Sequence, residues 1–325
     1  GVQGFIGGNH FLNQMAARTG DGRAAALARF LLETPERKFF HANEETAYYH
    51  GAVWGLLTDE SAVTPATIES PSRPLTHFED SGLVQYQDPA ADVVLSLRCG
   101  PWSGYTTERR APGPCDRMEM MGGAGHFILA VGGRPLLTTP DGGYRLRSAT
   151  RSVMLIDNAG PTGDIGYPMS IPSFRHRGEE VRAAHWSDAE GTGFVRLDLT
   201  PAYPAGAGLA SYTRDFLCVP GKHIICRDHV VASEPHRFAW LFQGMKDTGL
   251  ALEETPGGWT ATLGQVPRLR IAARSSGAAL SAACADTEVV YGYASSSHFA
   301  KFAHVRFETE PVRAVTVDFV LTWDS

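Results

Sequence analysis

The stretch RDFLCVPGKHIICRDHVV, residues 214–231, decides the fold class of this chain. Two short apolar runs lie on either side of VPGKH (219–223), and the Pro-Gly dipeptide inside it is a turn signal. A turn of this kind between two apolar runs predicts a tight hairpin of antiparallel strands.

Further short apolar runs, separated by Gly, Pro, Asp and Asn, extend in both directions from this hairpin. They are LVQYQ (83–87), DVVLSLRC (92–99), HFILAVGGRPLLT (126–138), SVMLIDN (152–158), GFVRLDLT (193–200), RFAWLFQ (237–243), WTATL (259–263), RLRIAA (268–273), EVVYGYA (288–294) and VRAVTVDFVLTW (312–323). So many strands with almost no helix between them favour a large antiparallel β-sandwich over a parallel α/β sheet.

Residues 9–58 have a helical pattern instead. Apolar residues recur there at helical spacing, and TGDG (19–22) is expected to end the first helix. Residues 23–33 and 44–57 are expected to form two more helices. A segment rich in Ser, Thr and Pro follows, which is typical of a linker.

The sequence therefore predicts an α+β protein with three parts. These are a short N-terminal helical segment (1–60), a linker (61–76) and a large antiparallel β-sandwich (77–325).

The composition limits the classes of function that the chain can have. Of the 325 residues, 43% are apolar and 20% are charged, as in a globular protein with a sizeable core. The net charge of −6 gives no field that would attract a polyanion, so we expect no nucleic-acid partner. No apolar run reaches the roughly 18 residues of a membrane span. The chain begins at Gly1 inside structured sequence, and if a leader has been removed, a periplasmic or secreted location is favoured.

The five cysteines are an odd number and include no Cys-x-x-Cys pair, which supports neither a disulfide framework nor a zinc ribbon. We expect buried free thiols. The alternative is that Cys218 and Cys226, which flank the Pro-Gly turn, face each other across the hairpin.

Familiar site motifs are missing from the sequence. There is no P-loop, no Gly-x-Ser-x-Gly, no His-Glu-x-x-His and no dinucleotide fingerprint in a strand–helix–strand context. We therefore expect no cofactor.

Five phrases of the strand region occur in a distinctive order. They are HFEDSGLVQYQDPAADVVLSLRCGPWSGY (77–105), GAGHFILAVGGRPLLTTPDGGY (123–144), ATRSVMLIDNAG (149–160), YTRDFLCVPGKHIICRDHV (212–230) and HRFAWLFQ (236–243). Their order and wording resemble the heparinase II/III-like polysaccharide lyases of bacterial type, in which a β-sandwich follows a helical toroid. The resemblance implies that the helical segment is the remnant of an α/α toroid, which an upstream segment or a partner chain would complete.

The same resemblance gives the helical segment a chemical role. GNHFLNQ (8–14) and EETAYYH (44–50) are similar to the two active-site segments of the toroid, which implies catalytic roles for Asn9, His10 and Tyr49. The implied reaction is β-elimination in a uronate-containing glycan. Asn9 and His10 would neutralise the uronate carboxylate, His10 also being a candidate base, and Tyr49 would transfer the proton. His50 is an expected substrate contact.

Each of these residues also has a purely structural interpretation. Asn9 suits the N-cap of the first helix, and His10 suits an exposed position in its first turn. Tyr49 shares a helix face with apolar residues and suits a core aromatic. Tyr48 competes with Tyr49, because it lies on a face of small residues that would border a cleft.

On the sandwich side, the family usually has a His-x-His-x-Asp phrase before the Gly-x-Phe strand. This chain has Glu119, Met121 and Gly123 there. Arg151 and Ser152 stand where a further family histidine precedes the Leu-Ile-Asp strand. Only Asp141 remains of the set that binds zinc in some members.

One carboxylate among Met and Arg residues is a poor zinc site, so we expect no bound metal. His126 would partly compensate as a nearby polar group and is a catalytic candidate; its structural interpretation is a hydrogen-bonded histidine at the start of a strand. The other expected substrate-binding residues are Arg117, Glu119, Tyr144, Arg147 and Arg151, together with Tyr48 as the alternative to Tyr49.

The sequence thus favours a polysaccharide lyase that acts on an acidic polysaccharide or oligosaccharide. The alternatives are a catalytically weakened glycan-binding protein, which the missing histidines favour, and a subunit of a larger lyase assembly.

Overall fold

The computed structural model describes the greater part of the strand region and two short pieces before it. The residues described are 16–26, 64, 66, 74–100, 106, 123–138, 148–161, 182–246, 249–264, 267–291 and 298–324. The chain divides into two compact units, Gly1–Pro71 and Ser72–Ser325. No helix in the described part of the chain combines the length and apolar content that crossing a bilayer requires.

The first unit contains the helix break that the TGDG sequence predicts. Residues 16–19 and 22–26 are helical, and Gly20 between them has a φ of +70°, which glycine adopts without strain. The Gly20 amide donates to the Ala16 carbonyl at 2.8 Å, and Asp21 Oδ1 accepts from the Arg23 amide at 2.9 Å. Asp21 therefore caps the second helix.

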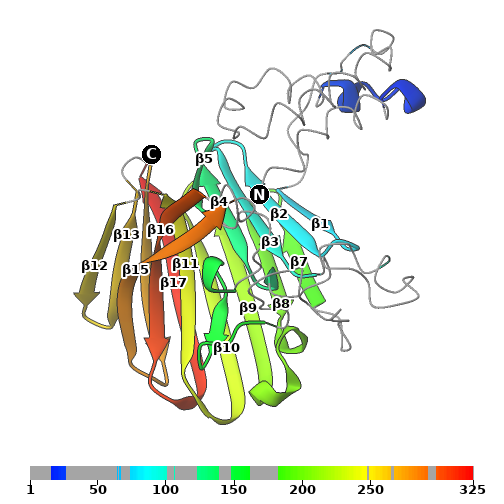
Figure 1. Ribbon diagram of the computed structural model, residues 1–325. Helices are drawn as coiled ribbons and strands as arrows, with labels where there is room; N and C mark the ends of the chain where they lie inside the picture. The colour runs from blue at the N-terminus through cyan, green and yellow to red at the C-terminus, as the bar shows by residue number, and fades with distance from the viewer. Residues whose placement is uncertain are drawn as a thin grey trace. The chain divides into compact units, whose positions relative to one another are not determined.

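The second unit is built from three antiparallel sheets (Figure 1). The five-stranded sheet has the order β1 (Leu75–Phe78), β2 (Leu83–Asp88), β3 (Val93–Arg98), β4 (Phe127–Val131) and β5 (Arg134–Leu137). The eight-stranded sheet has the order β12 (Leu250–Thr255), β13 (Gly258–Leu263), β14 (Arg268–Ser276), β17 (Val312–Asp324), β10 (His223–His236), β9 (Leu209–Val219), β8 (Gly193–Asp198) and β7 (Arg182–Ser187). The four-stranded sheet has the order β15 (Leu280–Tyr291), β16 (His298–Thr309), β11 (Phe238–Lys246) and β6 (Met154–Ile156). The predicted class, a large antiparallel sandwich after a small helical part, is confirmed.

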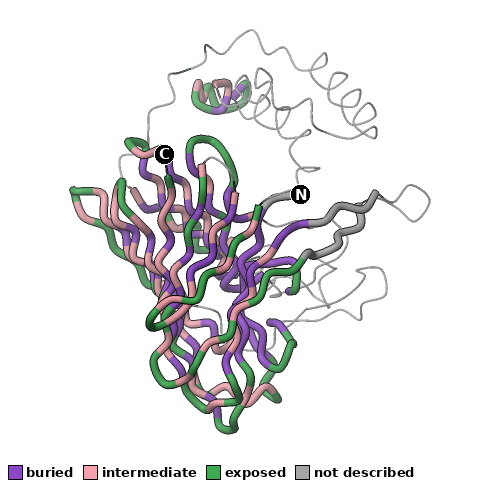
Figure 2. Tube along the Cα trace, turned by 90° about the vertical axis from the view of Figure 1, so that its left-hand side faces the viewer, coloured by how far each residue is buried: buried purple, intermediate pink, exposed green. Residues whose placement is uncertain are grey.

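The three sheets share one hydrophobic core. Buried and solvent-facing residues alternate along most of the strands (Figure 2), as period-2 side-chain direction requires, whereas β6 and residues 238–244 of β11 are buried throughout. Phe127 of the five-stranded sheet contacts Phe216 of the eight-stranded sheet and Phe242 of the four-stranded sheet, with ring centroids 5.2 and 5.8 Å apart. Phe319 of β17 also packs on Phe242, at 4.8 Å. Edge-to-face contacts of this kind hold the layers together.

The hairpin predicted around VPGKH joins β9 to β10, with Val219 opposite His223. Cys218 and Cys226 are both buried free thiols, as expected, but they do not face each other. Cys218 lies opposite Ile224 and Cys226 opposite Phe216, because the register that the turn sets offsets the two thiols. Cys99 is also buried, whereas Cys284 is exposed, contrary to the expectation of buried thiols.

The first strand begins inside the segment 61–76, which the sequence suggested as a linker. Leu75 is buried and pairs with Tyr86 of β2. Burial of this leucine against the five-stranded sheet outweighs the loop-like composition around it.

Tyr86 fastens the five-stranded sheet to the eight-stranded sheet. Its hydroxyl donates to the Gly191 carbonyl at 3.1 Å, and its ring lies against Gly193 of β8. A Cβ atom at Gly193 would lie 2.8 Å from Tyr86 Cδ2 and 3.3 Å from Leu75 Cδ1. The absence of a side chain at Gly193 is therefore what lets the two sheets approach.

Gly193→Ala is expected to lower the free energy of unfolding by about 1–3 kcal/mol, because the added methyl group overpacks this contact. Gly206→Ala is the matched control, since Gly206 has ordinary backbone and nothing within 4 Å of a Cβ. Urea unfolding of both variants measures the difference. Equal stabilities would show that Gly193 does not set the sheet spacing.

Candidate functional site

Of the residues expected to form the site, the structure describes His126 and Arg151. The rest lie outside the described residues: Asn9, His10, Tyr48, Tyr49, His50, Arg117, Glu119, Asp141, Tyr144 and Arg147. The site is therefore built here from its sandwich side.

Two Arg-Asp dipeptides lie at equal distances from the turn of the β9–β10 hairpin. The register places Arg214 directly opposite Asp228, and Asp215 directly opposite Arg227. Because successive side chains point to opposite faces of a sheet, one pair faces the core and the other faces solvent. The side chains of Arg214 and Asp228 are 2% and 0% exposed, whereas that of Arg227 is 56% exposed.

The inner pair is fully hydrogen-bonded. Arg214 Nε and Nη2 donate to the two oxygens of Asp228 at 2.8 and 2.6 Å, a bidentate arrangement. The Tyr212 hydroxyl and the Trp240 indole NH also donate to Asp228 Oδ2, at 2.9 and 2.6 Å. Burying two charges costs several kcal/mol each, and this cost is offset only by such complete pairing. Burial lowers the pKa of Arg214, but Asp228, Tyr212 and Cys226 together raise it well above its ordinary value.

Arg214 also reaches the segments that carry the two predicted site residues. Its Nη1 donates to the carbonyls of Gly125 and Ser152, at 2.6 and 3.2 Å. These residues are the immediate neighbours of His126 and Arg151. The inner ion pair therefore sets the relative position of the loop before β4 and the loop before β6.

Gly125 is required at this point. Its φ is +80°, and a Cβ there would lie 2.6 Å from Leu199 Cδ1. A larger residue would strain the backbone and displace the carbonyl that Arg214 binds.

His126 is held as a neutral ring with one defined tautomer. Its Nδ1 accepts a hydrogen bond from the Ser152 amide at 2.9 Å, so its proton lies on Nε2. The side chain is buried, and burial lowers the pKa of His126 well below 6.5, with further lowering by the positive charges of Arg151, Arg98 and Arg214. The bond to Ser152 occupies the nitrogen that a general base would use.

Arg151 fills the space beside Gly123. A Cβ at Gly123 would lie 2.5 Å from Arg151 Nη1 and 3.5 Å from Arg98 Cδ. The two departures from the family phrase, Gly123 and Arg151, are thus complementary, because the guanidinium occupies the volume that a side chain at 123 would need. Burial, and then the neighbouring charge of Arg151, lowers the pKa of Arg98 to about 10.

This cluster does not suit a zinc ion. Three guanidinium groups lower the pKa of His126, and their positive charges would repel a divalent cation. The lone pair of His126 Nδ1 also already accepts the hydrogen bond from the Ser152 amide, so it is not available to a metal. Within the described ranges, no three His, Cys, Asp or Glu side chains gather as metal ligands. The expectation of no zinc stays a prediction, since Asp141 lies outside those ranges.

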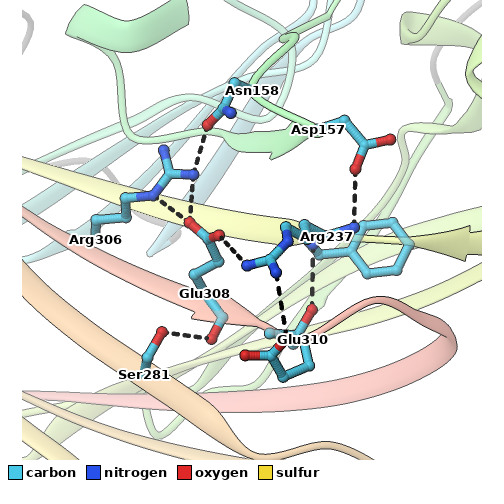
Figure 3. A network of polar contacts seen from close by, with 9 residues as sticks. Asp157, Asn158, Arg237, Ser281, Arg306, Glu308 and Glu310 are labelled. Carbon is cyan, nitrogen blue, oxygen red and sulfur yellow. Dashed lines mark hydrogen bonds and ion pairs between the residues drawn. The ribbon is translucent and has the colours of Figure 1, made fainter.

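A second, exposed network anchors the far end of β6 (Figure 3). Asp157 and Asn158 form its turn with φ values of 48° and 70°, a conformation that Asp and Asn tolerate. Asp157 accepts from the Arg237 amide at 3.0 Å, and Asn158 accepts from Arg306 at 2.6 Å. Glu308 in turn pairs with both arginines.

The hydrogen bonds of this network hold the side chains of Asp157 and Asn158, the turn in the phrase LIDNAG. The strand before that turn, β6, is only three residues long. Anchors at both ends, Ser152 by Arg214 and Asp157 by Arg237, fix the strand between them.

Reasoning from the sequence missed Arg98, Tyr212, Arg214, Asp228 and Trp240. One signal was present: the two Arg-Asp dipeptides are symmetric about the Pro-Gly turn, so a two-strand register drawn from that turn pairs each arginine with an aspartate.

The fold is shared with solved polysaccharide lyases. The chain resembles heparan sulfate lyase HepC from Pedobacter heparinus at 14% identity and a TM-score of 0.61, over 98% of this chain and 42% of that one. A heparinase III described as the BT4657 gene product aligns at 12% identity and a TM-score of 0.56, over 87% of this chain and 41% of that one. Another heparinase III structure aligns at 13% identity and a TM-score of 0.53, over 85% of this chain and 42% of that one.

These likenesses confirm the expected resemblance at the level of fold. The chain spans about 42% of the length of the lyases it matches. No protein-family model and no curated protein sequence matches it.

Asp228→Asn is expected to lower the free energy of unfolding by about 3–5 kcal/mol, because it leaves the charge of Arg214 buried and unbalanced. Asp318→Asn makes the same change in the exposed pair with Arg227 and is expected to cost less than about 1 kcal/mol. Denaturant unfolding compares the two. Similar losses would mean that the inner pair is not the buried charge centre of the sandwich.

The neutral state of His126 predicts a pH dependence of stability. Its folded pKa lies below the unfolded value of about 6.5, so the unfolded chain binds more protons below that pH. The contribution is complete above pH 6.5 and is lost as the pH falls towards the folded pKa. His126→Asn, which keeps an acceptor for Ser152, is expected to flatten the decline of stability between pH 6.5 and 5.

His229→Asn on the exposed face of β10 serves as the control and is expected to keep the wild-type slope. Unfolding free energies at several pH values measure both variants. An unchanged slope in His126→Asn would contradict a buried neutral ring.

Proposed function

We propose that this chain is the sandwich-bearing part of a polysaccharide lyase that cleaves an acidic, uronate-containing glycan by β-elimination. The observation that carries the proposal is the fold shared with a heparan sulfate lyase and with two heparinase III structures. The phrases of the sequence that resemble the lyase active-site segments agree with that fold.

The reaction sets clear demands. The C5 proton of a uronate is only weakly acidic, and removing it places negative charge on the adjacent carboxylate. An enzyme must stabilise that charge, take the proton and protonate the leaving oxygen at C4. In this proposal Asn9 and His10 neutralise the carboxylate, and Tyr49 transfers the proton. His50, Arg117, Glu119, Tyr144 and Arg147 are proposed as substrate contacts.

The sandwich is proposed to contribute positive potential. Arg98, Arg151 and Arg214 all lower the pKa of His126, so three guanidinium groups lie near that ring, and Arg214 also binds Asp228 in a bidentate ion pair. Fixed positive charge in a buried environment favours an anion more than it would in water. His126 is proposed as a positioning residue, and the hydrogen bond from the Ser152 amide to its Nδ1, next to Arg151, supports that role.

One observation favours the second candidate, a glycan-binding protein without catalysis. His126 and Arg151 are only 7% and 2% exposed, so neither offers a free face to a sugar. A lyase would then have to draw all of its catalytic groups from the helical residues.

The test is incubation of the chain with alginate, heparan sulfate, hyaluronan and chondroitin, followed by the ultraviolet absorbance of unsaturated product. We expect product from at least one glycan, and a loss of about 10²–10⁴-fold in rate for His10→Ala and Tyr49→Phe. Tyr48→Phe is the matched control and is expected to keep most of the activity.

Glycan binding without product would favour the binding protein and contradict the lyase. Product with full activity in Tyr49→Phe and none in Tyr48→Phe would keep the reaction class and move the proton transfer to Tyr48.

A further inference from the structure

A groove of about 320 Å³ opens at one end of the sandwich, far along the chain from the phrases that resemble the lyases. It lies between the β12–β13 turn and the β14–β15 connection, at the side of the sandwich that Figure 1 labels β12, β13 and β15. The residues that line it are Glu254, Thr255, Gly257, Gly258, Trp259, Ser275, Ala278, Ala279 and Leu280. Its size is at the lower end of the range for small-molecule sites.

The register of three neighbouring strands builds this groove. Glu254 of β12 lies directly opposite Trp259 of β13, which lies directly opposite the buried Ala273 of β14. Side chains two residues apart share a face, so Ser275 belongs to the same inward-facing surface. The inward rows are Leu250–Leu252–Glu254, Leu263–Ala261–Trp259 and Leu269–Ile271–Ala273–Ser275.

Each of these rows is apolar until it reaches the groove. The three rows end side by side in the carboxylate of Glu254, the indole of Trp259 and the hydroxyl of Ser275. They lie on a face of the sheet that elsewhere forms the hydrophobic core. The polar groups thus interrupt the core pattern at the groove.

The backbone of the groove is fixed and leaves the opening uncovered. Trp259 donates its indole NH to the Leu280 carbonyl at 2.8 Å, which holds the ring against the β14–β15 connection. Thr255 Oγ1 donates to the Gly258 carbonyl at 3.2 Å across the turn. Gly257 carries no side chain over the opening, and Gly258 has room for none, because its Cβ would lie 2.0 Å from the Ala273 carbonyl.

Two polar groups of the groove are not used by the fold. Within the described part of the chain, the Glu254 carboxylate makes no hydrogen bond or ion pair, and Ser275 Oγ has no hydrogen-bond partner although it is shielded from water. An unsatisfied hydroxyl costs about 1–3 kcal/mol. Rotation of the Ser275 side chain towards a bound hydroxyl would recover that bond.

We infer that this groove binds a neutral, hydroxyl-rich sugar ring. The indole of Trp259 offers an apolar surface for the CH groups of a pyranose. The Glu254 carboxylate accepts hydrogen bonds from ring hydroxyls, and bonds to an ionised acceptor are about twice as strong as neutral ones. The same carboxylate repels a uronate, so the groove selects against the charge class of the proposed lyase substrate.

The inference does not depend on β-elimination. It describes an accessory saccharide site that would hold a neutral part of a glycan, or a neutral neighbouring polymer, while the reaction takes place elsewhere.

Isothermal titration calorimetry of the full chain with cellotriose tests the site. We expect saturable binding, and a decrease in affinity of about tenfold or more, equal to about 1.4 kcal/mol, in Glu254→Gln and in Trp259→Phe. Glu253→Gln is the matched control: the neighbouring carboxylate lies on the opposite face of β12, and its loss is expected to change the affinity less than twofold. Trigalacturonate is expected to bind more weakly than cellotriose at this groove.

Three results would overturn the inference. They are the absence of saturable cellotriose binding by the wild-type chain, equal affinities of the wild type and Glu254→Gln, and tighter binding of trigalacturonate that depends on Trp259. Far-ultraviolet circular dichroism of each variant establishes that it is folded, and Glu254→Gln changes an exposed side chain. Lyase activity towards uronate glycans is expected to be the same in Glu254→Gln as in the wild type. Loss of cellotriose binding would therefore contradict the groove alone, whereas absence of lyase product would contradict only the proposed function.

Discussion

The buried carboxylate of Asp228 is the constraint on which the rest of the sandwich depends. It accepts two hydrogen bonds from Arg214 and one each from Tyr212 and Trp240, at distances between 2.6 and 2.9 Å. These donors come from β9 and β11, while Asp228 lies on β10. An ionised group in a core is tolerated only when such donors surround it, so the strands must keep one register and one spacing. The charge that the fold has to bury thus makes its packing specific.

The same ion pair connects the core to the candidate site. The remaining nitrogen of Arg214 binds the carbonyls next to His126 and Arg151. His126 then accepts the Ser152 amide, and Arg151 takes the space that Gly123 leaves open. Arg151 and Gly123, which stand where the resembling phrases have a histidine and an aspartate, fit each other, because the guanidinium occupies the volume beside the glycine. Three guanidinium groups, those of Arg98, Arg151 and Arg214, thus lie near His126 in this cluster.

Much of the fold follows from the sequence, because alternating apolar residues and turn signals depend only on local geometry. The β9–β10 hairpin and the helix break at Gly20 are of this kind. The edge strands β7 (RAAHWS) and β12 (LALEET) were not predicted, because neither has a regular alternation of apolar and polar residues, and each is a strand because a neighbour pairs with it. For the candidate site, His126 and Arg151 were predicted through phrase resemblance. Asp228 was not, since either residue of an Arg-Asp dipeptide can face inward, and only the register decides between them.

The central claim is that this buried cluster holds His126 neutral, with its proton on Nε2. Long-range ¹H–¹⁵N NMR spectra of the histidine rings, with the His126 signals assigned by their loss in His126→Asn, test it directly. The account predicts an unprotonated Nδ1 and a protonated Nε2 from pH 8 down to pH 5.5. A His126 ring that is protonated on both nitrogens at pH 6, or that carries its proton on Nδ1, would contradict it.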